Sequence, residues 1–393
     1  MKKSITEICE LIRGVTFSKG DAKTCIQNSY MPVFRSNNIQ DGRLIFDDLI
    51  YIEQDNIKEN QILKIGDVVI TASTGSKLVI GKAAQLATKW TGSFGAFCIV
   101  LRPKTNLVDP RFFGYYFQTP DYRKAISHMS SGANINNLKK SYFDKLKIEV
   151  PFFEEQKRIV RELDAADALR QKRKQAIALL DDYLKAVFME MFGGELESGS
   201  DELRKYLKVI GGGAFKSTDF QDIGVPVIKI GTVNKGFFDL YNCSFLPSDF
   251  LKDKKNGKYI ISPGDLLISL TGTVGKEDYG NVCFSTAEYP QYLLNQRVAK
   301  LDFDRNILTR EFLFFFFQAE QIKSQLTSIS RGVRQANISN EDILSLKISL
   351  PAIEKQETFS NIVQKVKFLK QPMMIQSVQL DMHFNALMQV AFK

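Results

Sequence analysis

An internal repeat with a spacing of 200 residues constrains this sequence more than any other feature. The segment PFFEEQKRIV, which starts at Pro151, shares its Pro, Glu and Gln positions with PAIEKQETFS, which starts at Pro351. Other identities at this spacing are Gly132 and Gly332, Asn137 and Asn337, Leu146 and Leu346, Lys147 and Lys347, and Ile148 and Ile348. Nearer the N-terminus the register slips slightly, with residues 14–17 matching 212–215, 32–35 matching 226–229 and 66–70 matching 264–268. The chain therefore consists of one unit of about 200 residues used twice.

Length and composition favour two related globular units in a reducing compartment. A chain of 393 residues can bury two cores of ordinary size. Its net charge of +9 suits a polyanionic partner, although such an excess also occurs in proteins without one. The five cysteines show no C-x-x-C spacing, which argues against a zinc site or a disulfide framework. We therefore expect free thiols and a cytoplasmic location.

The sequence gives no sign of export or membrane insertion. Glu7, Glu10 and Arg13 interrupt the apolar stretch that a signal peptide would need. The most apolar run, residues 312–317, is far shorter than the roughly 20 residues that span a bilayer. It has a counterpart at residues 112–117, so we interpret both as buried helices in the two repeats.

The first 150 residues of each unit predict an α+β fold. Short apolar runs bounded by turn residues predict strands at 68–70, 97–101, 225–230 and 266–268. Apolar residues at helical spacing predict helices over 110–127 and 310–327.

The last part of each unit predicts a long helix with a heptad seam. In the first unit the seam positions are Ile159, Leu163, Ala166, Leu169, Arg173, Ile177, Leu180, Leu184, Val187 and Met191. The second unit repeats them as Phe359, Val363, Val366, Leu369, Met373, Ser377, Leu380, Phe384, Leu387 and Ala391. Each helix would extend for roughly 57 Å, too far for its own globular part to cover, so the two seams are expected to pair. A two-fold relation between the units would make the pair antiparallel.

These patterns divide the chain into four segments. Residues 1–150 and 196–350 form the two globular domains, residues 151–195 form the first long helix with its linker, and residues 351–393 form the second long helix. The linker is placed at residues 193–200, and Pro372 is expected to break or bend the second helix near Gln371.

Catalytic motifs are missing from the sequence. The Gly81-Lys82 and Gly275-Lys276 pairs lack the remaining residues of a phosphate-binding loop. His128 and His383 are not at metal-ligand spacing, and neither G-x-S-x-G nor H-E-x-x-H occurs. The Asn/Asp-Pro-Pro-aromatic signature of adenine methyltransferases is also missing. The chain is therefore interpreted as a binding protein.

The polar loops of each unit have residue types that suit nucleic acid. Guanidinium groups and amides around a glycine can contact guanine, phosphate or adenine, as in residues 330–339. Hydroxyl groups, glycines and a lysine after an apolar strand can hold a phosphate, as in residues 71–77 and 269–276. Ordinary polar turns remain the alternative for these loops. The candidate DNA-contacting residues are Arg35, Asn37, Thr74, Ser76, Lys77, Asn134, Asn136 and Asn137 in the first unit, and Lys229, Thr271, Thr273, Lys276, Arg331, Arg334, Gln335 and Asn337 in the second.

The order of these motifs resembles the specificity subunit of type I restriction-modification systems. The resemblance rests on Pro-x-(Ile/Val)-(Arg/Lys), Gly-Asp-(Leu/Val)-(Leu/Val)-Ile, the segment 294–299, Arg331-Gly with Asn337, and the doubled Pro-x-x-Glu-x-Gln that opens a long helix. It implies two target-recognition domains in a pseudo-two-fold repeat, joined by two long antiparallel coiled-coil helices. It further implies DNA contacts by Gln296 and Arg297. The first unit has Ala96 and Phe97 instead, so this role does not carry over to it.

The resemblance also implies a function and a set of partners. Each domain would read one half of a bipartite, asymmetric site in double-stranded DNA, and the helices would dock two modification subunits. Those subunits would bind S-adenosylmethionine, and restriction/translocase subunits would use ATP and Mg²⁺. This chain would bind no cofactor and perform no catalysis. The alternatives are a stand-alone DNA-binding regulator, an orphan specificity protein, a fragment of a type IIG enzyme, or a coiled-coil scaffold that does not bind nucleic acid.

Overall fold

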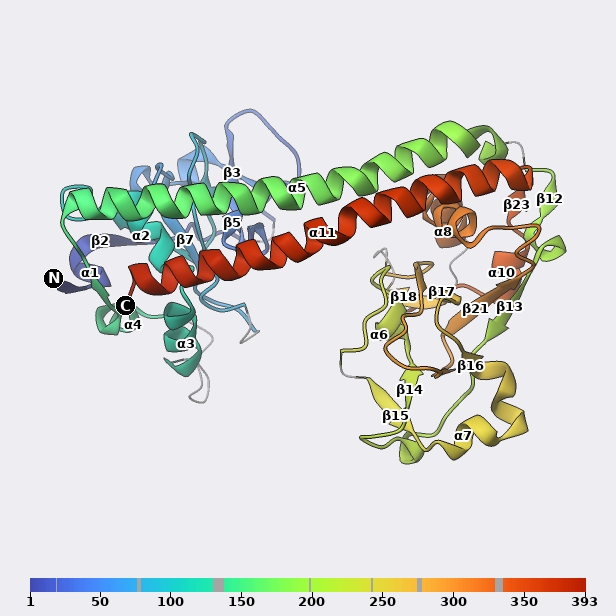
Figure 1. The fold of residues 1–393 in the computed structure, drawn as a ribbon. Coiled ribbons are helices and arrows are strands. Elements are labelled where there is room, and N and C mark those ends of the chain that lie inside the picture. Colours follow the sequence, from blue (N-terminus) through green and yellow to red (C-terminus); the bar gives the residue numbers. More distant parts are fainter. Residues whose placement is uncertain are drawn as a thin grey trace. The chain divides into compact units, whose positions relative to one another are not determined.

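The computed structural model describes residues 1–18, 20–75, 79–129, 138–197, 199–241, 243–273, 278–328 and 335–393. These residues form two compact units. Unit 1 consists of Met1–Lys174 together with Ile375–Lys393, and unit 2 consists of Gln175–Met374. Both long helices, α5 (Phe153–Glu197) and α11 (Ile353–Ala391), pass from one unit into the other (Figure 1). Each unit therefore contains a globular repeat, one half of α5 and one half of α11.

The globular part of unit 1 combines short strands with short helices. Its main sheet is four-stranded, in the order β2-β10-β7-β8, and a three-stranded sheet has the order β6-β3-β9. The strands are β1 (Lys2–Ser4), β2 (Cys9–Arg13), β3 (Tyr30–Phe34), β4 (Ile39–Gln40), β5 (Arg43–Leu44), β6 (Ile50–Glu53), β7 (Val68–Thr71), β8 (Ala83–Gln85), β9 (Ser93–Phe94), β10 (Cys98–Pro103) and β11 (Lys147–Glu149). The helices are α1 (Ile5–Ile8), α2 (Pro110–Tyr116), α3 (Pro120–Met129) and α4 (Lys140–Lys145).

Unit 2 repeats this plan. Its main sheet has the order β13-β21-β17-β19, and a second sheet has the order β15-β14-β20-β16. The strands are β12 (Asp201–Glu202), β13 (Leu207–Gly211), β14 (Val225–Ile228), β15 (Ser244–Leu246), β16 (Ile260–Ile261), β17 (Leu266–Ser269), β18 (Thr271–Thr273), β19 (Val282–Phe284), β20 (Tyr292–Leu294), β21 (Val298–Phe303), β22 (Gln335–Asn337) and β23 (Lys347–Ile348). The helices are α6 (Ile230–Val233), α7 (Asp249–Lys252), α8 (Arg310–Gln318), α9 (Glu320–Ser328) and α10 (Asn340–Leu344). The predicted repeat of two α+β units with long helices is confirmed.

A buried glutamine explains why Pro-x-x-Glu-x-Gln occurs at the start of both long helices. In unit 1 the amide of Gln156 accepts a hydrogen bond from the backbone N–H of Asp109 at 2.7 Å and donates one to the carbonyl of Pro151 at 2.8 Å. In unit 2 Gln356 accepts from Thr309 N–H at 2.9 Å and donates to the carbonyl of Pro351 at 2.9 Å. Both glutamines are buried. Because buried polar groups need partners, this side chain fixes the start of each long helix against the loop before α2 or α8.

The long helices complete the hydrophobic core of each unit. In unit 1, Ile159, Leu163 and Ala166 of α5 join Phe384 and Met388 of α11 in one core with the globular domain. In unit 2 the corresponding residues are Leu184, Phe188 and Phe192 of α5, together with Phe359, Val363 and Val366 of α11. The pairing within each unit is antiparallel, since early residues of one helix meet late residues of the other. A two-fold relation between the units predicts this direction.

Toward the middle of the helices, ion pairs replace apolar packing. In unit 1, Arg170 Nε lies 2.7 Å from Asp381 Oδ1, and in unit 2, Lys370 Nζ lies 2.6 Å from Asp181 Oδ1. The predicted seam residues Leu169 and Leu369 are instead exposed, at 57% and 56%. A straight α-helix has 3.6 residues per turn, so its contact face drifts away from a strict heptad repeat. The residue after each leucine therefore faces the partner helix. The seam prediction is therefore wrong at these two leucines.

Three further expectations are corrected. Of the break or bend expected near Gln371, the break does not occur: helix α11 continues through Pro372, which lies on an exposed face where water can replace the lost backbone hydrogen bond. Helix α5 extends to Glu197 through Gly193 and Gly194, which the sequence placed in a linker. The predicted helices over 110–127 and 310–327 are each split in two, as α2 with α3 and α8 with α9.

The phenylalanine-rich run of the second repeat forms α8 and packs into the core. Five of the six residues from Phe312 to Phe317 are buried, and only Phe314 is intermediate. In the described ranges, no helix combines the length and the apolar character that crossing a membrane requires. The interpretation of this run as a core helix is confirmed.

The core packing in unit 2 yields a stability prediction. The Phe188 ring lies between 5.2 and 5.8 Å, centroid to centroid, from Phe192, Phe312, Phe315 and Phe359. We expect Phe188→Ala to lower the free energy of unfolding by about 3–5 kcal/mol, because it leaves a cavity in this cluster. Leu369→Ala, at an exposed position of the same unit, should change it by less than about 0.5 kcal/mol. Equal effects in urea unfolding would contradict this packing.

Candidate nucleic-acid interface

Three loops meet at the end of the main sheet in each unit, held by the same backbone hydrogen bonds. In unit 2 the N–H of Leu270 donates to the carbonyl of Arg297 at 2.9 Å, and its carbonyl accepts from Ile338 N–H at 2.8 Å. In unit 1 Ala72 N–H donates to the Phe97 carbonyl at 2.8 Å, and the Ala72 carbonyl accepts from Leu138 N–H at 2.7 Å. We call this arrangement the three-loop cluster: the segment after β7 or β17, the turn before β10 or β21, and the segment before α4 or α10.

In unit 2 two of the predicted loops form a small ribbon. Strands β18 and β22 are antiparallel, with Thr271 opposite Asn337 and Thr273 opposite Gln335. Thr271 is buried and Thr273 is exposed. The backbone N–H and the hydroxyl of Thr273 both donate to Asp278, at 2.7 and 3.0 Å. The structure thus brings together four residues that the sequence selected from segments about 60 positions apart.

The turn of Gln296 and Arg297 lies beside this ribbon. Both residues are exposed, and Arg297 has φ of +74°, a conformation that costs a non-glycine residue on the order of 1 kcal/mol or more. The N–H of Gln296 donates to the carbonyl of Gly213 at 2.9 Å. A Cβ on Gly212 would lie 2.2 Å or less from the Asn295 backbone, and one on Gly14 would meet Gly95 in the same way at 2.2 Å. Close backbone approach therefore explains the glycine that both repeats share at this point.

Arg35 and Asn37 meet at one carboxylate. Arg35 Nη2 lies 2.8 Å from Asp48 Oδ2 and 2.7 Å from its carbonyl, and Asn37 Nδ2 lies 2.8 Å from the same Oδ2. The carbonyl of Phe34, just before Arg35, accepts from Gly95 N–H at 2.9 Å, so this pair adjoins the turn of the three-loop cluster. The guanidinium charge is balanced internally in this arrangement.

Lys229 is also engaged within its own unit. Its Nζ lies 2.8 Å from the Ser244 hydroxyl and 3.8 Å from the centroid of the Phe220 ring. The carbonyl of Ile228 accepts from Asn295 N–H at 3.0 Å, which places Lys229 next to the turn of unit 2, as Arg35 is in unit 1. Thr74 is partly exposed in the segment after β7.

Several predicted contacts lie outside the described residues. These are Ser76, Lys77, Asn134, Asn136, Asn137, Lys276, Arg331 and Arg334, together with the side chain of Gln335.

Sequence reasoning missed Phe97, which is 67% exposed in the turn of unit 1. Its position equals that of Arg297 in the repeat, and this equivalence is the signal that could have selected it. The next residue, Cys98, is buried, and burial raises the pKa of its thiol to about 12. Burial raises the pKa of Cys283 to about 12 as well. These thiols stay protonated at neutral pH, so neither supplies a nucleophile near the cluster.

Known proteins share both the sequence and the fold. The family model described as "Type I restriction modification DNA specificity domain" matches residues 1–179 and again residues 202–370. The EcoKI specificity subunit of Escherichia coli K12 is 29% identical over 388 residues, which cover 93% of this chain and 81% of that protein. The MjaVIII specificity subunit of Methanocaldococcus jannaschii is 24% identical and covers 86% of this chain and 79% of its own length.

Solved structures show the same fold at low sequence identity. The type I restriction-modification S subunit from M. genitalium aligns with a TM-score of 0.52 at 15% identity, over 100% of this chain and 96% of that chain. A chain from a study of type I R-M complex assembly and conformational transition aligns with a TM-score of 0.53 at 16% identity, over 100% of this chain and 97% of the other. With two matches to the family model that together cover most of its length, this chain belongs to the type I restriction-modification DNA specificity family.

Proposed function

We propose that this chain reads DNA for a type I restriction-modification complex, with each globular domain recognising one half of a bipartite, asymmetric site. The observation that carries the proposal is the three-loop cluster, which is built twice by the same backbone hydrogen bonds but displays different side chains. A shared backbone frame with different exposed groups suits two readers of different sequences, because base edges are distinguished by side-chain hydrogen bonds and apolar contacts.

The polar groups of the cluster favour double-stranded DNA as the ligand. Unit 2 offers the amide of Gln296 and the guanidinium of Arg297 at an exposed turn, beside the ribbon that carries Thr273. Arginine pairs with guanine, glutamine pairs with adenine, and hydroxyl groups hold phosphates. The net charge of +9 adds a general attraction to a polyanion.

We further propose that the long helices dock two methyltransferase subunits. In unit 1 the exposed large apolar side chains of these helices are Phe153, Leu169, Ile375, Val378, Met382 and Val390, and in unit 2 they are Leu179, Tyr183, Met189, Phe368, Leu369 and Met374. Exposed apolar patches of this kind mark protein–protein contacts. Their repetition in both units suits one modification subunit per unit. Methyl transfer with S-adenosylmethionine, and ATP- and Mg²⁺-dependent translocation, would then belong to partner subunits, and this chain would bind no cofactor.

The docking surface is tested by placing a charge on it. Val378→Glu and Phe368→Glu should each reduce co-purification with the modification subunit at least tenfold, because a desolvated carboxylate opposes an apolar interface. The control is Gln379→Glu, which places the same carboxylate at an exposed polar position of α11. Circular dichroism should show an unchanged fold in all three variants. Unaltered partner binding by both docking variants would exclude this surface.

The bipartite site is tested by exchanging one domain. Residues 1–150 are replaced by the equivalent segment of another family member, and the hybrid is expressed with its modification subunit. Sequencing of methylated bases in the host genome should then show a motif with one half changed and the other half kept, since each domain reads independently. A motif changed in both halves would refute independent reading. If the complex with the natural chain methylates no specific DNA motif, the proposed function is refuted.

A further inference from the structure

We infer that Phe97 and Arg297 are the specificity-determining residues at equivalent positions of the two half-sites, Phe97 contacting a thymine methyl group and Arg297 pairing with guanine. This inference rests on the proposed function and deepens it. The family resemblance implies that Arg297 contacts DNA but names no base for it, and it gives Phe97 no role.

The equivalence of the two positions follows from the backbone. The carbonyl of Phe97 accepts from Ala72 N–H and that of Arg297 accepts from Leu270 N–H, at 2.8 and 2.9 Å. Gly95 pairs with Val15 in a parallel bridge, as Asn295 does with Gly213. The two turns are therefore held at both sides by matching bonds, and Phe97 and Arg297 occupy equivalent positions in them. Their backbone conformations differ, because only Arg297 of the two has a positive φ.

Phe97 is an apolar side chain without a place in the core. It is 67% exposed, whereas Phe94 and Cys98, on either side of the turn, have no exposed surface. Leaving a phenylalanine in water is unfavourable, and contact with DNA would remove it from water. Among side chains that read DNA, phenylalanine makes apolar contact with the C5-methyl group of thymine, which distinguishes an A·T pair in the major groove.

Arg297 is held out of the protein in a strained conformation. Its φ of +74° places it in the left-handed region, which a non-glycine residue adopts at a cost and which occurs preferentially at functional sites. Among the described residues, its guanidinium has no carboxylate partner of the kind that binds Arg35 to Asp48. An exposed guanidinium on a fixed turn suits the two acceptors, O6 and N7, that guanine presents in the major groove.

The experiment compares methylation motifs in cells that express the complete complex. Phe97→Ala should weaken the preference for an A·T pair at one position of one half-site, and Phe97→Arg should change the preferred base there to guanine. Arg297→Ala should weaken the preference for guanine at one position of the other half-site. The discrimination against other bases there should fall by about 5- to 150-fold. The matched controls are Ile65→Ala, an exposed apolar residue of unit 1, and Arg305→Ala, an exposed arginine of unit 2.

The outcomes separate the inference from the proposed function. If the three substitutions at Phe97 and Arg297 leave the motif unchanged while the complex with the natural chain methylates a bipartite site, the reading roles of Phe97 and Arg297 are wrong and the function stands. A change in the wrong half-site, or the same change with the control variants, also overturns the inference. If the unmodified complex methylates no bipartite site, the proposed function itself fails.

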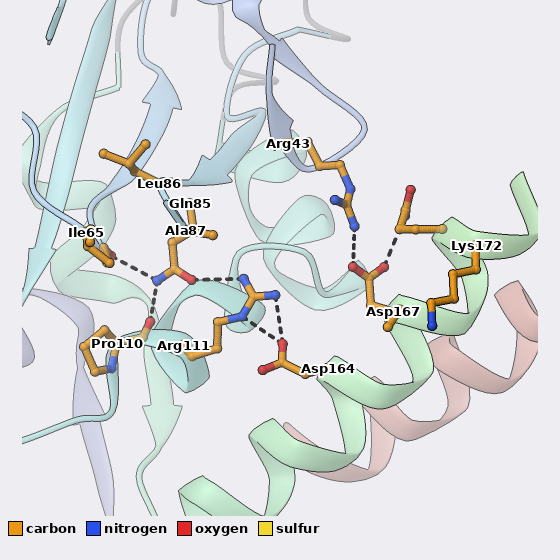
Figure 2. A pocket seen from close by; sticks show the side chains of 13 residues that line it. Arg43, Ile65, Gln85, Leu86, Ala87, Pro110, Arg111, Asp164, Asp167 and Lys172 are labelled. Atoms are coloured by element: carbon orange, nitrogen blue, oxygen red, sulfur yellow. Dashed lines mark hydrogen bonds and ion pairs between the residues drawn. The ribbon is translucent and has the colours of Figure 1, made fainter. Parts of the chain in front are cut away.

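A second observation carries an independent inference. We propose that charged contacts make each globular domain pack on its own segment of a long helix and not on the equivalent segment of the other long helix. In unit 1, Arg111 of α2 donates through Nε to Asp164 Oδ1 of α5 at 2.8 Å, and Tyr115 donates its hydroxyl proton to the same atom. One turn further along, Arg43 pairs with Asp167 (Figure 2). Here the globular domain is positive and the helix is negative.

Unit 2 has the reverse arrangement at the equivalent positions. Glu311 of α8 replaces Arg111 and is buried, and its Oε1 accepts from Gln364 Nε2 of α11 at 3.0 Å. Lys367 replaces Asp167 in the repeat. Burial lowers the pKa of Lys367, and the charge of Glu311 acts in the opposite direction. Here the globular domain presents a carboxylate, which Arg310 of the same helix α8 also pairs through Nε at 3.0 Å. The helix presents the neutral Gln364 and the cationic Lys367.

This reversal of charge makes it unfavourable for a globular domain to pack on the long-helix segment that belongs to the other domain. A first domain seated on the α11 segment would bring Arg111 toward Lys367, and a second domain seated on the α5 segment would bring Glu311 toward Asp164 and Asp167. Like charges in a partly buried contact repel, and an unpaired buried charge costs more than the pair gains. Because the apolar seams of the two helices are similar, these charges supply the discrimination that the seams lack.

A double-mutant cycle in the full chain tests this assignment. Arg111→Glu alone places a carboxylate against Asp164, whereas Arg111→Glu with Asp164→Gln copies the Glu311 and Gln364 pair of unit 2 into unit 1. The single substitution should lower the urea midpoint of unfolding, and the double substitution should recover at least half of that loss. Lys124→Glu, an equal charge change at an exposed position of α3, should leave the midpoint unchanged. Additive effects of the two substitutions, or an unchanged midpoint for Arg111→Glu, would overturn the assignment.

Discussion

The packing of a half of α5 against a half of α11 is the interaction on which both units depend. Neither half-helix has a complete core of its own, and neither globular repeat covers its half-helix alone. In unit 1, Phe384 and Met388 reach the same core as Ile159 and Leu163, and in unit 2, Phe359 reaches the same core as Phe188. The glutamine at position 156 or 356 then fixes where each helix begins relative to α2 or α8. The position of the three-loop cluster follows from this framework.

Much of the framework was predictable because the repeat reveals it. Residues that recur after 200 positions mark what the fold needs, such as Gln156 with Gln356. The failures have local physical causes. Pro372 does not break α11 because it lies on an exposed face, and Leu169 leaves the seam because an ion pair of Arg170 takes the facing position. Periodicity alone does not contain either fact, since both depend on what the opposite surface presents.

The candidate site was predictable in part. The loops after the strands were selected for their hydroxyl groups, amides, glycines and cationic side chains. Gln296 and Arg297 were selected only through the family resemblance. Arg35 and Lys229 were selected for their charge, but their partners Asp48 and Ser244 lie 13 and 15 positions away and only the fold brings them together. Phe97 was not selected because an aromatic residue in an apolar run is normally a core residue. Its exposure is visible only once the turn is placed.

Unit 2 is one continuous stretch of chain, whereas unit 1 is interrupted by it. The core of unit 1 includes Phe384 and Met388, so a ribosome must synthesise all of unit 2 before unit 1 can be completed. A nascent chain that stops early lacks part of the first core as well as the second globular repeat. Such a product is exposed to proteolysis, because its apolar surfaces from α5 and the first domain stay uncovered. Chain topology thus acts as a check during synthesis: a molecule that lacks unit 2 does not reach a finished fold in unit 1 either.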